Sequence, residues 1–291
     1  MAHAMGADFL EQDVVLTKDG APIVLHDIHL EYTTDVRQRY PDRARSDGHY
    51  YALDFSLTEI RTLRAQERTD DGKSPVYPAR FPLGAGEFRV PTLEQEIALV
   101  DGLNKSCNNT VGLYIELKAP RWHQAQGYDV AAAVLAVLEH TGYSGRTDQV
   151  FLQCFDHSTL KQLRFEFKTP LPLIQLIGEN DWGEDTDGDY QQMRTDQGLA
   201  EIARYADGIG PWLTQVLEPG NGGDLAPTGL TARAHKCGLL VHPYTLRQDE
   251  LPEGIDHLDT VHHALFVKAG ADGAFTDFPD LTRQYIDRMP R

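Results

Sequence analysis

Residues 6–27 read GADFLEQDVVLTKDGAPIVLHD, and they decide how the rest of the chain is arranged. Two apolar runs in this stretch predict two extended segments joined by a turn at 18–20. Glu11 and Asp13 are two residues apart on the first segment, so both side chains leave one face of a strand about 7 Å apart. The second segment returns and delivers His26. The pattern therefore predicts two carboxylates and one imidazole at one end of a strand pair.

Two interpretations of these three polar side chains stay open from this stretch alone. They are either ordinary polar residues of a half-exposed strand, with a hydrogen-bonded histidine, or a set of metal ligands. A second stretch favours the metal site. Residues 112–120 read GLYIELKAP, and alternation places Glu116 and Lys118 on one face of a strand. An acid and a base on one face of a buried strand are costly unless they are paired or bound to a ligand.

Six motifs follow one another along nearly the whole chain: GADFLEQD (6–13), VLHD (24–27), YIELK (114–118), FLQCFD (151–156), HPYT (242–245) and GAFTDFP (273–279). In this order they resemble the glycerophosphodiester phosphodiesterases, most closely the calcium-dependent, periplasmic branch of that family. The resemblance implies a TIM-type (β/α)8 barrel. It also implies hydrolysis of glycerophosphodiesters to sn-glycerol 3-phosphate and an alcohol.

One family motif has no counterpart in this sequence. The family begins with a strand that carries His-Arg-Gly and with a Pro-Glu that opens the first helix, whereas residues 1–6 here read MAHAMG. Gly6 resembles the terminator of that helix. We therefore expect the first strand, most of the first helix and one catalytic histidine to be missing. A fragment, a start assigned to an internal methionine, and a protein that truly lacks this histidine are all compatible with the sequence.

Strand and helix patterns alternate along the rest of the chain. Besides the strands near residues 10 and 114, the sequence predicts strands at 150–155, 171–177, 208–210, 238–244 and 273–277. It predicts helices that start at Ser56 and at Thr92. Further helices are predicted at 129–139, 158–166, 197–205, 228–236, 258–269 and 280–288. This makes seven strands, whereas a closed barrel needs eight. We expect one barrel domain over 1–291, with an insertion at 28–92 after the second strand of the barrel. The insertion either covers the catalytic face or is a spacer.

The charge and the hydrophobicity of the chain exclude some classes of binding partner. With a net charge of −17 over 291 residues, the chain would attract neither nucleic acid nor an anionic membrane surface. No apolar run is long enough to cross a bilayer. A bound divalent cation reverses the sign of the local field, so an acidic chain is compatible with a phosphodiester substrate. The resemblance implies a periplasmic or secreted protein if a signal peptide lies upstream, and a cytoplasmic one otherwise.

The strand ends of a β/α barrel form its active site, and the resemblance assigns roles there. It makes Glu11, Asp13 and Glu116 the ligands of a cation, Ca²⁺ or alternatively Mg²⁺. Hard carboxylate ligands suit these two ions better than they suit zinc. It makes Lys118 a point charge for the phosphate and His26 an acid/base. The substrate-binding candidates, each with a packing alternative, are Gln153, His242, Trp212 and Phe278, with Trp182 as a further aromatic and Asp277 at a strand end.

Other polar residues are interpreted without a role in catalysis. His123 follows the strand of Glu116 and could reach the site, but we expect it on an exposed loop. His257, His262 and His263 are expected at solvated helix positions. The acidic run within residues 178–196 lacks the terminal bidentate acid of a calcium loop, so we expect an exposed acidic loop. The cysteines, Cys107, Cys154 and Cys237, show neither metal-ligand spacing nor the pairing expected of a disulfide framework.

Two functions besides the hydrolase stay open at this point. A sphingomyelinase-like phospholipase or lyase on the same barrel would use the same metal and histidines, with a cyclic phosphate as its product. A truncated homologue could bind the cation or a glycerophosphate without turnover. The lack of an apolar membrane-binding stretch favours a hydrolase of water-soluble substrates over the lyase.

Overall fold

The computed structural model describes residues 1–70, 73–220 and 224–289, and the chain divides into two compact units. The first unit comprises Met1–Glu11, Leu103–Ile115 and Ser144–Arg291, and the second comprises Gln12–Gly102 and Glu116–Tyr143. Strands β1 (Phe9–Leu16) and β3 (Gly112–Leu117) begin in the first unit and end in the second. Helix α3 (Leu93–Cys107) begins in the second unit and ends in the first.

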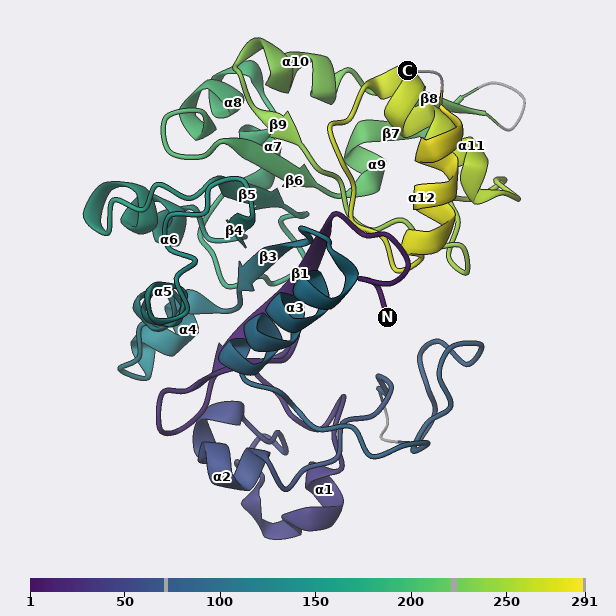
Figure 1. Ribbon diagram of the computed structural model, residues 1–291. Coiled ribbons are helices and arrows are strands. Elements are labelled where there is room, and N and C mark those ends of the chain that lie inside the picture. The colour runs from purple at the N-terminus through teal and green to yellow at the C-terminus, as the bar shows by residue number, and fades with distance from the viewer. Residues whose placement is uncertain (71–72, 221–223, 290–291) are drawn as a thin grey trace. The chain divides into compact units, whose positions relative to one another are not determined.

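A sheet runs through the first unit in the strand order β1-β3-β4-β5-β6-β9 (Figure 1). Its later strands are β4 (Val150–Cys154), β5 (Leu173–Ile177), β6 (Gly208–Pro211) and β9 (Leu240–Val241). These four strands pair in parallel. Every residue of β5 and β6 is buried, as expected for parallel strands that are covered on both faces. Among the described residues the strand order does not close on itself.

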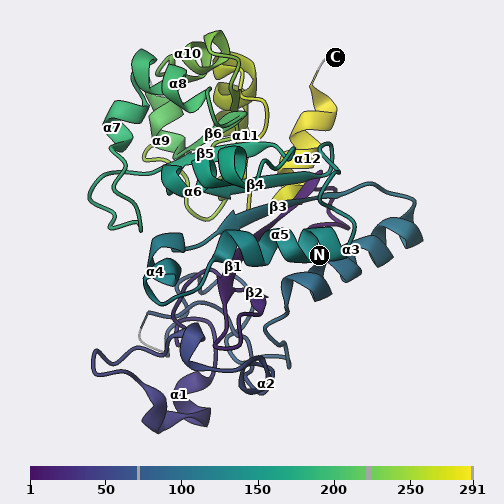
Figure 2. The same ribbon diagram turned by 90° about the vertical axis from the view of Figure 1, so that its left-hand side faces the viewer.

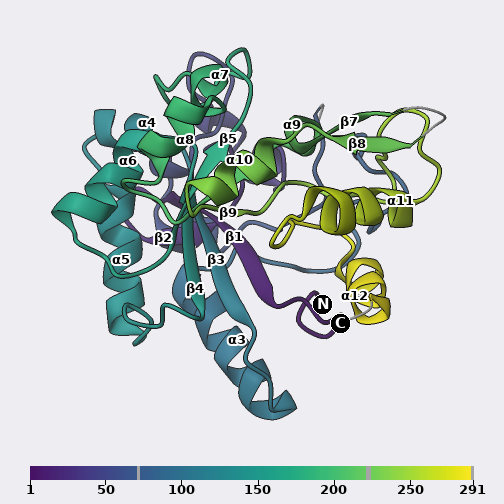
Figure 3. The same cartoon turned by 90° about the horizontal axis from the view of Figure 1, so that it is seen from above.

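Helices follow these strands, because a parallel pair needs a crossover connection. The α-helices that lie wholly in the first unit are α6 (His157–Lys161), α7 (Tyr190–Met193), α8 (Asp196–Ile202), α9 (Leu213–Val216), α10 (Leu230–Lys236), α11 (Leu258–His262) and α12 (Pro279–Arg288). Figure 1 shows α8 and α10 along one side of β6 and β9. In Figure 3, α12 lies beside the N-terminal segment, where Arg283 Nε donates to the Gly6 carbonyl over 3.0 Å.

The strands predicted at 150–155, 171–177 and 208–210 are confirmed, but the one predicted at 273–277 is wrong. Only an isolated parallel bridge joins Thr276 to Leu246. Pro243 stands in the neighbouring segment and has no amide hydrogen, so it cannot continue a ladder of hydrogen bonds. A short antiparallel pair, β7 (Leu217–Pro219) with β8 (Leu225–Pro227), was not predicted.

The second unit is built around the hairpin predicted from residues 6–27. Strand β2 (Pro22–Val24) pairs antiparallel with β1, with Val15 opposite Ile23. Besides the start of α3, the α-helices of this unit are α1 (Val36–Arg39), α2 (Leu57–Ile60), α4 (Pro120–Ala125) and α5 (Val130–His140). Long irregular segments join β2, α1 and α2 (Figure 2). Residues of the 28–92 segment nevertheless bury a core of their own against Val15 and Ile23, including Phe55 and Ile60.

The predicted helix starts are confirmed by their capping hydrogen bonds. Ser56 and Glu59 form a capping box at α2, in which each side chain bonds the backbone N–H of the other residue. Thr92 and Gln95 do the same at the start of α3. Over the described ranges, none of the helices combines the length and the apolar character that crossing a membrane requires.

Candidate functional site

Two carboxylates of the second unit, one from β1 and one from near the end of β3, lie beside the same lysine. Glu116 on β3 is only 7% exposed, and Lys118 Nζ lies 2.7 Å from its Oε1. The same ammonium is 3.7 Å from Asp13 Oδ1 on β1, and the Lys118 amide donates to the Val14 carbonyl over 3.1 Å. Asp13 Oδ1 is buried and accepts no hydrogen bond from any described residue. We call Asp13 and Glu116 the acidic pair.

The acidic pair carries more negative charge than its surroundings compensate. The pKa of Glu116 is raised to about 7, chiefly by burial; Lys118 opposes this rise, and the nearby charge of Asp13 adds to it. One ammonium thus faces two carboxylates, one of which has a buried oxygen without a donor. Such an arrangement fits a hard divalent cation, which would supply the missing positive charge.

Glu11 belongs to the first unit and lies two residues before Asp13 on β1, so strand alternation gives both side chains the same face. Its Oε1 accepts a hydrogen bond of 3.1 Å from Nε2 of Gln153, a buried residue of β4. Gln153 therefore positions the Glu11 carboxylate. The predicted metal and substrate roles of these two residues stay predictions.

His26 follows β2 and has two polar partners. Its side chain is 57% exposed, and Nδ1 lies 2.9 Å from Asp27 Oδ1. Arg68 donates to the other oxygen, Asp27 Oδ2, over 2.5 Å, and is 3.1 Å from His26 Nδ1. Burial alone would raise the pKa of Asp27, but His26 and Arg68 lower it to about 2. An ionised Asp27 can accept the Nδ1 proton, which leaves Nε2 as the other ring nitrogen of His26, and the predicted acid/base role of His26 stays a prediction.

His26 and the acidic pair both belong to the second unit, and two observations relate them. The Leu25 amide, one residue before His26, donates to the carbonyl of Asp13 over 2.9 Å. A charge on His26 also acts on the Glu116 carboxyl, whose pKa it lowers. The hairpin thus returns the chain to Asp13 at Leu25, one residue before His26, and the role of His26 in the site stays a prediction. Arg68, 42 residues away in sequence, was missed, because no local pattern relates it to His26.

His242 of the first unit lies in an aromatic environment. Its Nδ1 is 2.9 Å from the Tyr114 hydroxyl, and its ring lies edge-on to Tyr114 and Phe151. Burial raises the pKa of Tyr114 well above its ordinary value, so the phenol keeps its proton and donates it to Nδ1. Burial lowers the pKa of His242 to about 4, against the smaller opposing effect of Asp272. A neutral, hydrogen-bonded imidazole results, and its predicted contact with substrate stays a prediction.

The neutral state of His242 makes stability depend on pH. The pKa of His242 is about 4 in the folded chain and 6.5 ordinarily. The stability that the neutral ring contributes is therefore complete above pH 6.5 and is lost as the pH falls towards 4. We expect His242→Gln to remove about 3 kcal/mol of the pH dependence of the unfolding free energy over this range. Urea titrations at several pH values measure it. The control is His140→Gln, whose parent side chain is 76% exposed. Equal pH slopes in His242→Gln and the unmodified chain would contradict the assignment.

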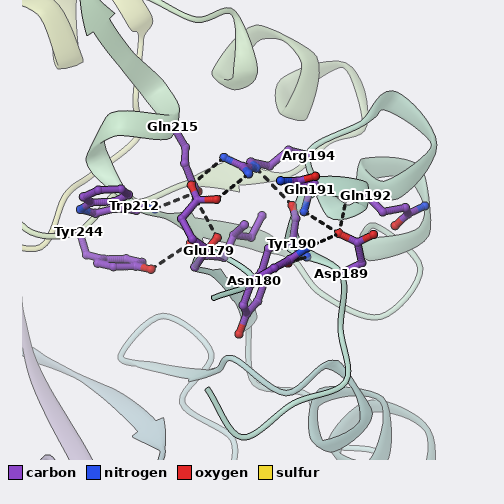
Figure 4. A network of polar contacts seen from close by, with 12 residues as sticks. Glu179, Asn180, Asp189, Tyr190, Gln191, Gln192, Arg194, Trp212, Gln215 and Tyr244 are labelled. Atoms are coloured by element: carbon purple, nitrogen blue, oxygen red, sulfur yellow. Dashed lines mark hydrogen bonds and ion pairs between the residues drawn. The ribbon is translucent and has the colours of Figure 1, made fainter. Parts of the chain in front are cut away.

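The two tryptophans that were predicted to contact substrate follow strands of the first unit, Trp182 after β5 and Trp212 after β6. Trp182 is 42% and Trp212 36% exposed, and their rings meet edge to face at 5.1 Å. The loop that bears Trp182 is anchored by Glu179, which is held by two hydrogen bonds from Arg194 and one from Gln215 (Figure 4). These partners hold the loop at Glu179, and the predicted contact of the two indoles with substrate stays a prediction.

Phe278 and Asp277 are placed at the start of α12. The Phe278 amide donates to the Thr276 hydroxyl, and the Phe278 ring is half-buried. Asp277 accepts a hydrogen bond from Arg247 Nε over 2.8 Å, in an exposed ion pair. The substrate role of Phe278 stays a prediction.

Two histidine predictions are wrong. His123 is buried on α4, where Nε2 accepts from the Leu16 amide over 3.2 Å and Nδ1 donates to the Ala119 carbonyl over 2.8 Å. His262 is buried beside Thr282, 3.1 Å away, because it faces the packed side of its helix. His257 and His263 are exposed as predicted. The acidic 178–196 segment also contains α7, which Asp189 caps through its side chain.

The chain is similar to a set of known proteins. A family model described as the glycerophosphoryl diester phosphodiesterase family matches residues 1–281. A glycerophosphodiester phosphodiesterase of Haemophilus influenzae is 41% identical over 304 residues, covering 98% of this chain and 84% of that protein. Another, from Treponema pallidum, is 35% identical over 309 residues, covering 100% of this chain and 87% of that protein.

Similarity extends to solved structures. The structure of a candidate glycerophosphoryl diester phosphodiesterase from Silicibacter pomeroyi DSS-3 matches with a TM-score of 0.72 and 26% identity, covering 98% of this chain and 85% of that one. This match confirms the predicted TIM-type α/β class. The described strands form an open order in which β2 adds antiparallel to β1 at one edge and β1, β3, β4, β5, β6 and β9 follow, so they do not close into an eight-stranded barrel.

Proposed function

Because the chain belongs to the glycerophosphoryl diester phosphodiesterase family, we propose that it hydrolyses glycerophosphodiesters to sn-glycerol 3-phosphate and an alcohol. The observation that carries the proposal is near-full-length similarity to two relatives of that name. The acidic pair beside His26 supports it, since phosphodiester hydrolysis needs positive charge at the phosphate and an acid/base near the leaving oxygen.

A divalent cation fits the residues of this site. Asp13 and Glu116 would hold it together with Glu11, whose carboxylate is positioned by Gln153. Three carboxylates are a hard donor set, which suits Ca²⁺ or Mg²⁺. When bound, the cation would neutralise charge that develops on the phosphate oxygens. The buried Asp13 oxygen, for which no donor exists among the described residues, supports this assignment.

Other side chains of this chain would transfer protons and contact the substrate. His26 Nε2 would give a proton to the leaving alcohol or take one from the attacking nucleophile, while Asp27 holds the other ring nitrogen. Lys118 would add a positive charge to the phosphate. Trp212 and Trp182, both exposed in the first unit, would contact the carbon skeleton of the substrate.

Product analysis tests the proposal. The chain is incubated with glycerophosphocholine and Ca²⁺, and the phosphorus-containing products are identified by ³¹P NMR. We expect sn-glycerol 3-phosphate and choline as the end products. A cyclic glycerophosphate that accumulates as the end product would show a lyase and contradict the proposal. Binding of Ca²⁺ without any turnover would contradict it too and would favour the binding-only alternative.

Arg68 should act on the reaction by positioning Asp27 and, through it, His26. We expect Arg68→Gln to lower kcat about 10- to 100-fold and to leave KM nearly unchanged, since a misoriented acid/base affects the chemical step. Arg68→Lys, which keeps the charge, should recover part of the loss. Steady-state kinetics with glycerophosphocholine measure both variants. The matched control is Arg39→Gln, which removes an exposed arginine paired with Asp35. An unchanged kcat in Arg68→Gln would contradict this role.

A further inference from the structure

We propose that His29, Glu31 and His49 bind one transition-metal ion of the zinc type, at a site separate from the acidic pair. The three residues belong to the second unit and lie within the 28–92 segment. Each offers one ligand atom, and these atoms all lie within 4.8 Å of one another. The proposal concerns metal binding alone and does not depend on hydrolytic activity.

The two imidazoles are already arranged side by side. Their rings stack with centroids 4.4 Å apart and planes at 19°, and Tyr51 lies edge-on to His29 at 4.6 Å. The backbone holds this geometry, because His29 and Tyr51 form an antiparallel bridge. His29 Nε2 is buried, and within the described ranges it has no hydrogen-bond partner. A buried imidazole nitrogen without a partner is costly unless a ligand binds it.

Glu31 supplies a negative charge in the same place. Its side chain is completely buried, with Oε1 2.6 Å from His49 Nδ1 and Oε2 accepting from the Tyr50 amide over 3.0 Å. Arg37 Nη2 lies 4.0 Å from Glu31 Oε1, and the Arg37 side chain is half-exposed. This ion pair with a permanently charged group is long at 4.0 Å, so a cation bound between Glu31 and the two imidazoles would supply a closer positive charge. The Tyr50 amide would keep the carboxylate oriented when the metal is bound.

The donor set decides the kind of metal. Two imidazole nitrogens with one carboxylate and an open fourth position are typical of Zn²⁺, whereas Ca²⁺ and Mg²⁺ prefer oxygen ligands. Zinc bonds of about 2.0–2.1 Å place tetrahedral ligand atoms about 3.4 Å apart. The separations of up to 4.8 Å need shifts on the order of 1 Å to reach that geometry. Burial lowers the pKa of His29, so this imidazole is in the neutral form that ligates metals.

A metal bound by His29, Glu31 and His49 would also connect separate segments of the second unit. His29 and Glu31 lie three and five residues after His26, and His49 comes from a segment that follows α1. A metal held by all three would tie the chain after His26 to residues 49–51. We expect the bound ion to stabilise this part of the second unit.

Calorimetry on the intact chain tests the proposal. Zn²⁺ is titrated in the presence of excess Ca²⁺, which occupies carboxylate sites but competes poorly for imidazoles. We expect one Zn²⁺ to bind, and His29→Gln and His49→Gln each to weaken binding about 100-fold or more. His140→Gln, which removes an exposed histidine, and Glu116→Gln, which alters the acidic pair, should leave the affinity unchanged.

A second measurement does not depend on whether the variants fold. Co²⁺ bound to the unmodified chain in excess Ca²⁺ should give the intense visible absorption of a four-coordinate site. The proposal is overturned by a weak, octahedral-type spectrum, by no Zn²⁺ binding in excess Ca²⁺, or by the same affinity in His29→Gln, His49→Gln and the unmodified chain.

Discussion

Glu116→Gln should abolish hydrolysis of glycerophosphocholine and, in the same protein, stabilise the metal-free chain at pH 8. Glutamine keeps the shape of the side chain but removes the charge that would bind the cation. Loss of a metal-binding carboxylate removes the charge stabilisation of the transition state, so we expect kcat/KM to fall by at least about 10³-fold. Kinetics with saturating Ca²⁺ measure the loss, and Glu139→Gln, at an exposed position on α5, is the control.

The stability gain follows from the raised pKa of Glu116. The pKa is about 7 in the folded chain and 4.5 ordinarily, so the metal-free protein loses stability as the pH rises from 4.5 through 7. The difference corresponds to about 3 kcal/mol at most. The amide of the introduced glutamine stays neutral, and Lys118 keeps Asp13 as its partner, so we expect a gain of about 2 kcal/mol at pH 8 in EDTA. A variant that is less stable than the unmodified chain at pH 8 would contradict the buried-charge argument.

His26→Gln should lower kcat about 10²- to 10⁴-fold, the usual cost of losing a positioned acid/base. Glutamine can still bond Asp27 but cannot exchange a proton near neutral pH. Folding should be little affected, because the His26 side chain is 57% exposed. Kinetics with glycerophosphocholine measure the loss. His257→Gln, at an exposed position in the first unit, should retain full activity. If His26→Gln retains more than about a tenth of the activity, another group performs the proton transfer.

Local patterns were enough to predict the parts of the fold that are set by neighbouring residues. The alternation around Glu11 and Asp13, the turn before β2 and the caps at Ser56 and Thr92 all appear as expected. The acidic pair was found because Glu116 stands in a buried, alternating strand. Such signals depend only on spacing along the chain and on the cost of burying charge.

Features that depend on tertiary contacts could not be predicted in the same way. Arg68 reaches Asp27 across 41 residues of sequence, and the His123 ring bonds the backbone of β1. The strand predicted at 273–277 failed because its potential partner contains Pro243, although its own residues are suitable. These outcomes depend on which segments meet in the fold, which neither periodicity nor composition specifies.

The most direct measurement is the turnover of glycerophosphocholine before and after removal of divalent cations. The chain is treated with EDTA, desalted into metal-free buffer and assayed for sn-glycerol 3-phosphate, then titrated with Ca²⁺ and, separately, with Mg²⁺. We predict no turnover in the stripped protein and full recovery with one of these ions in the unmodified chain, but none in Glu116→Gln. Undiminished turnover in the stripped protein would contradict the claim that the acidic pair holds a cation required for hydrolysis.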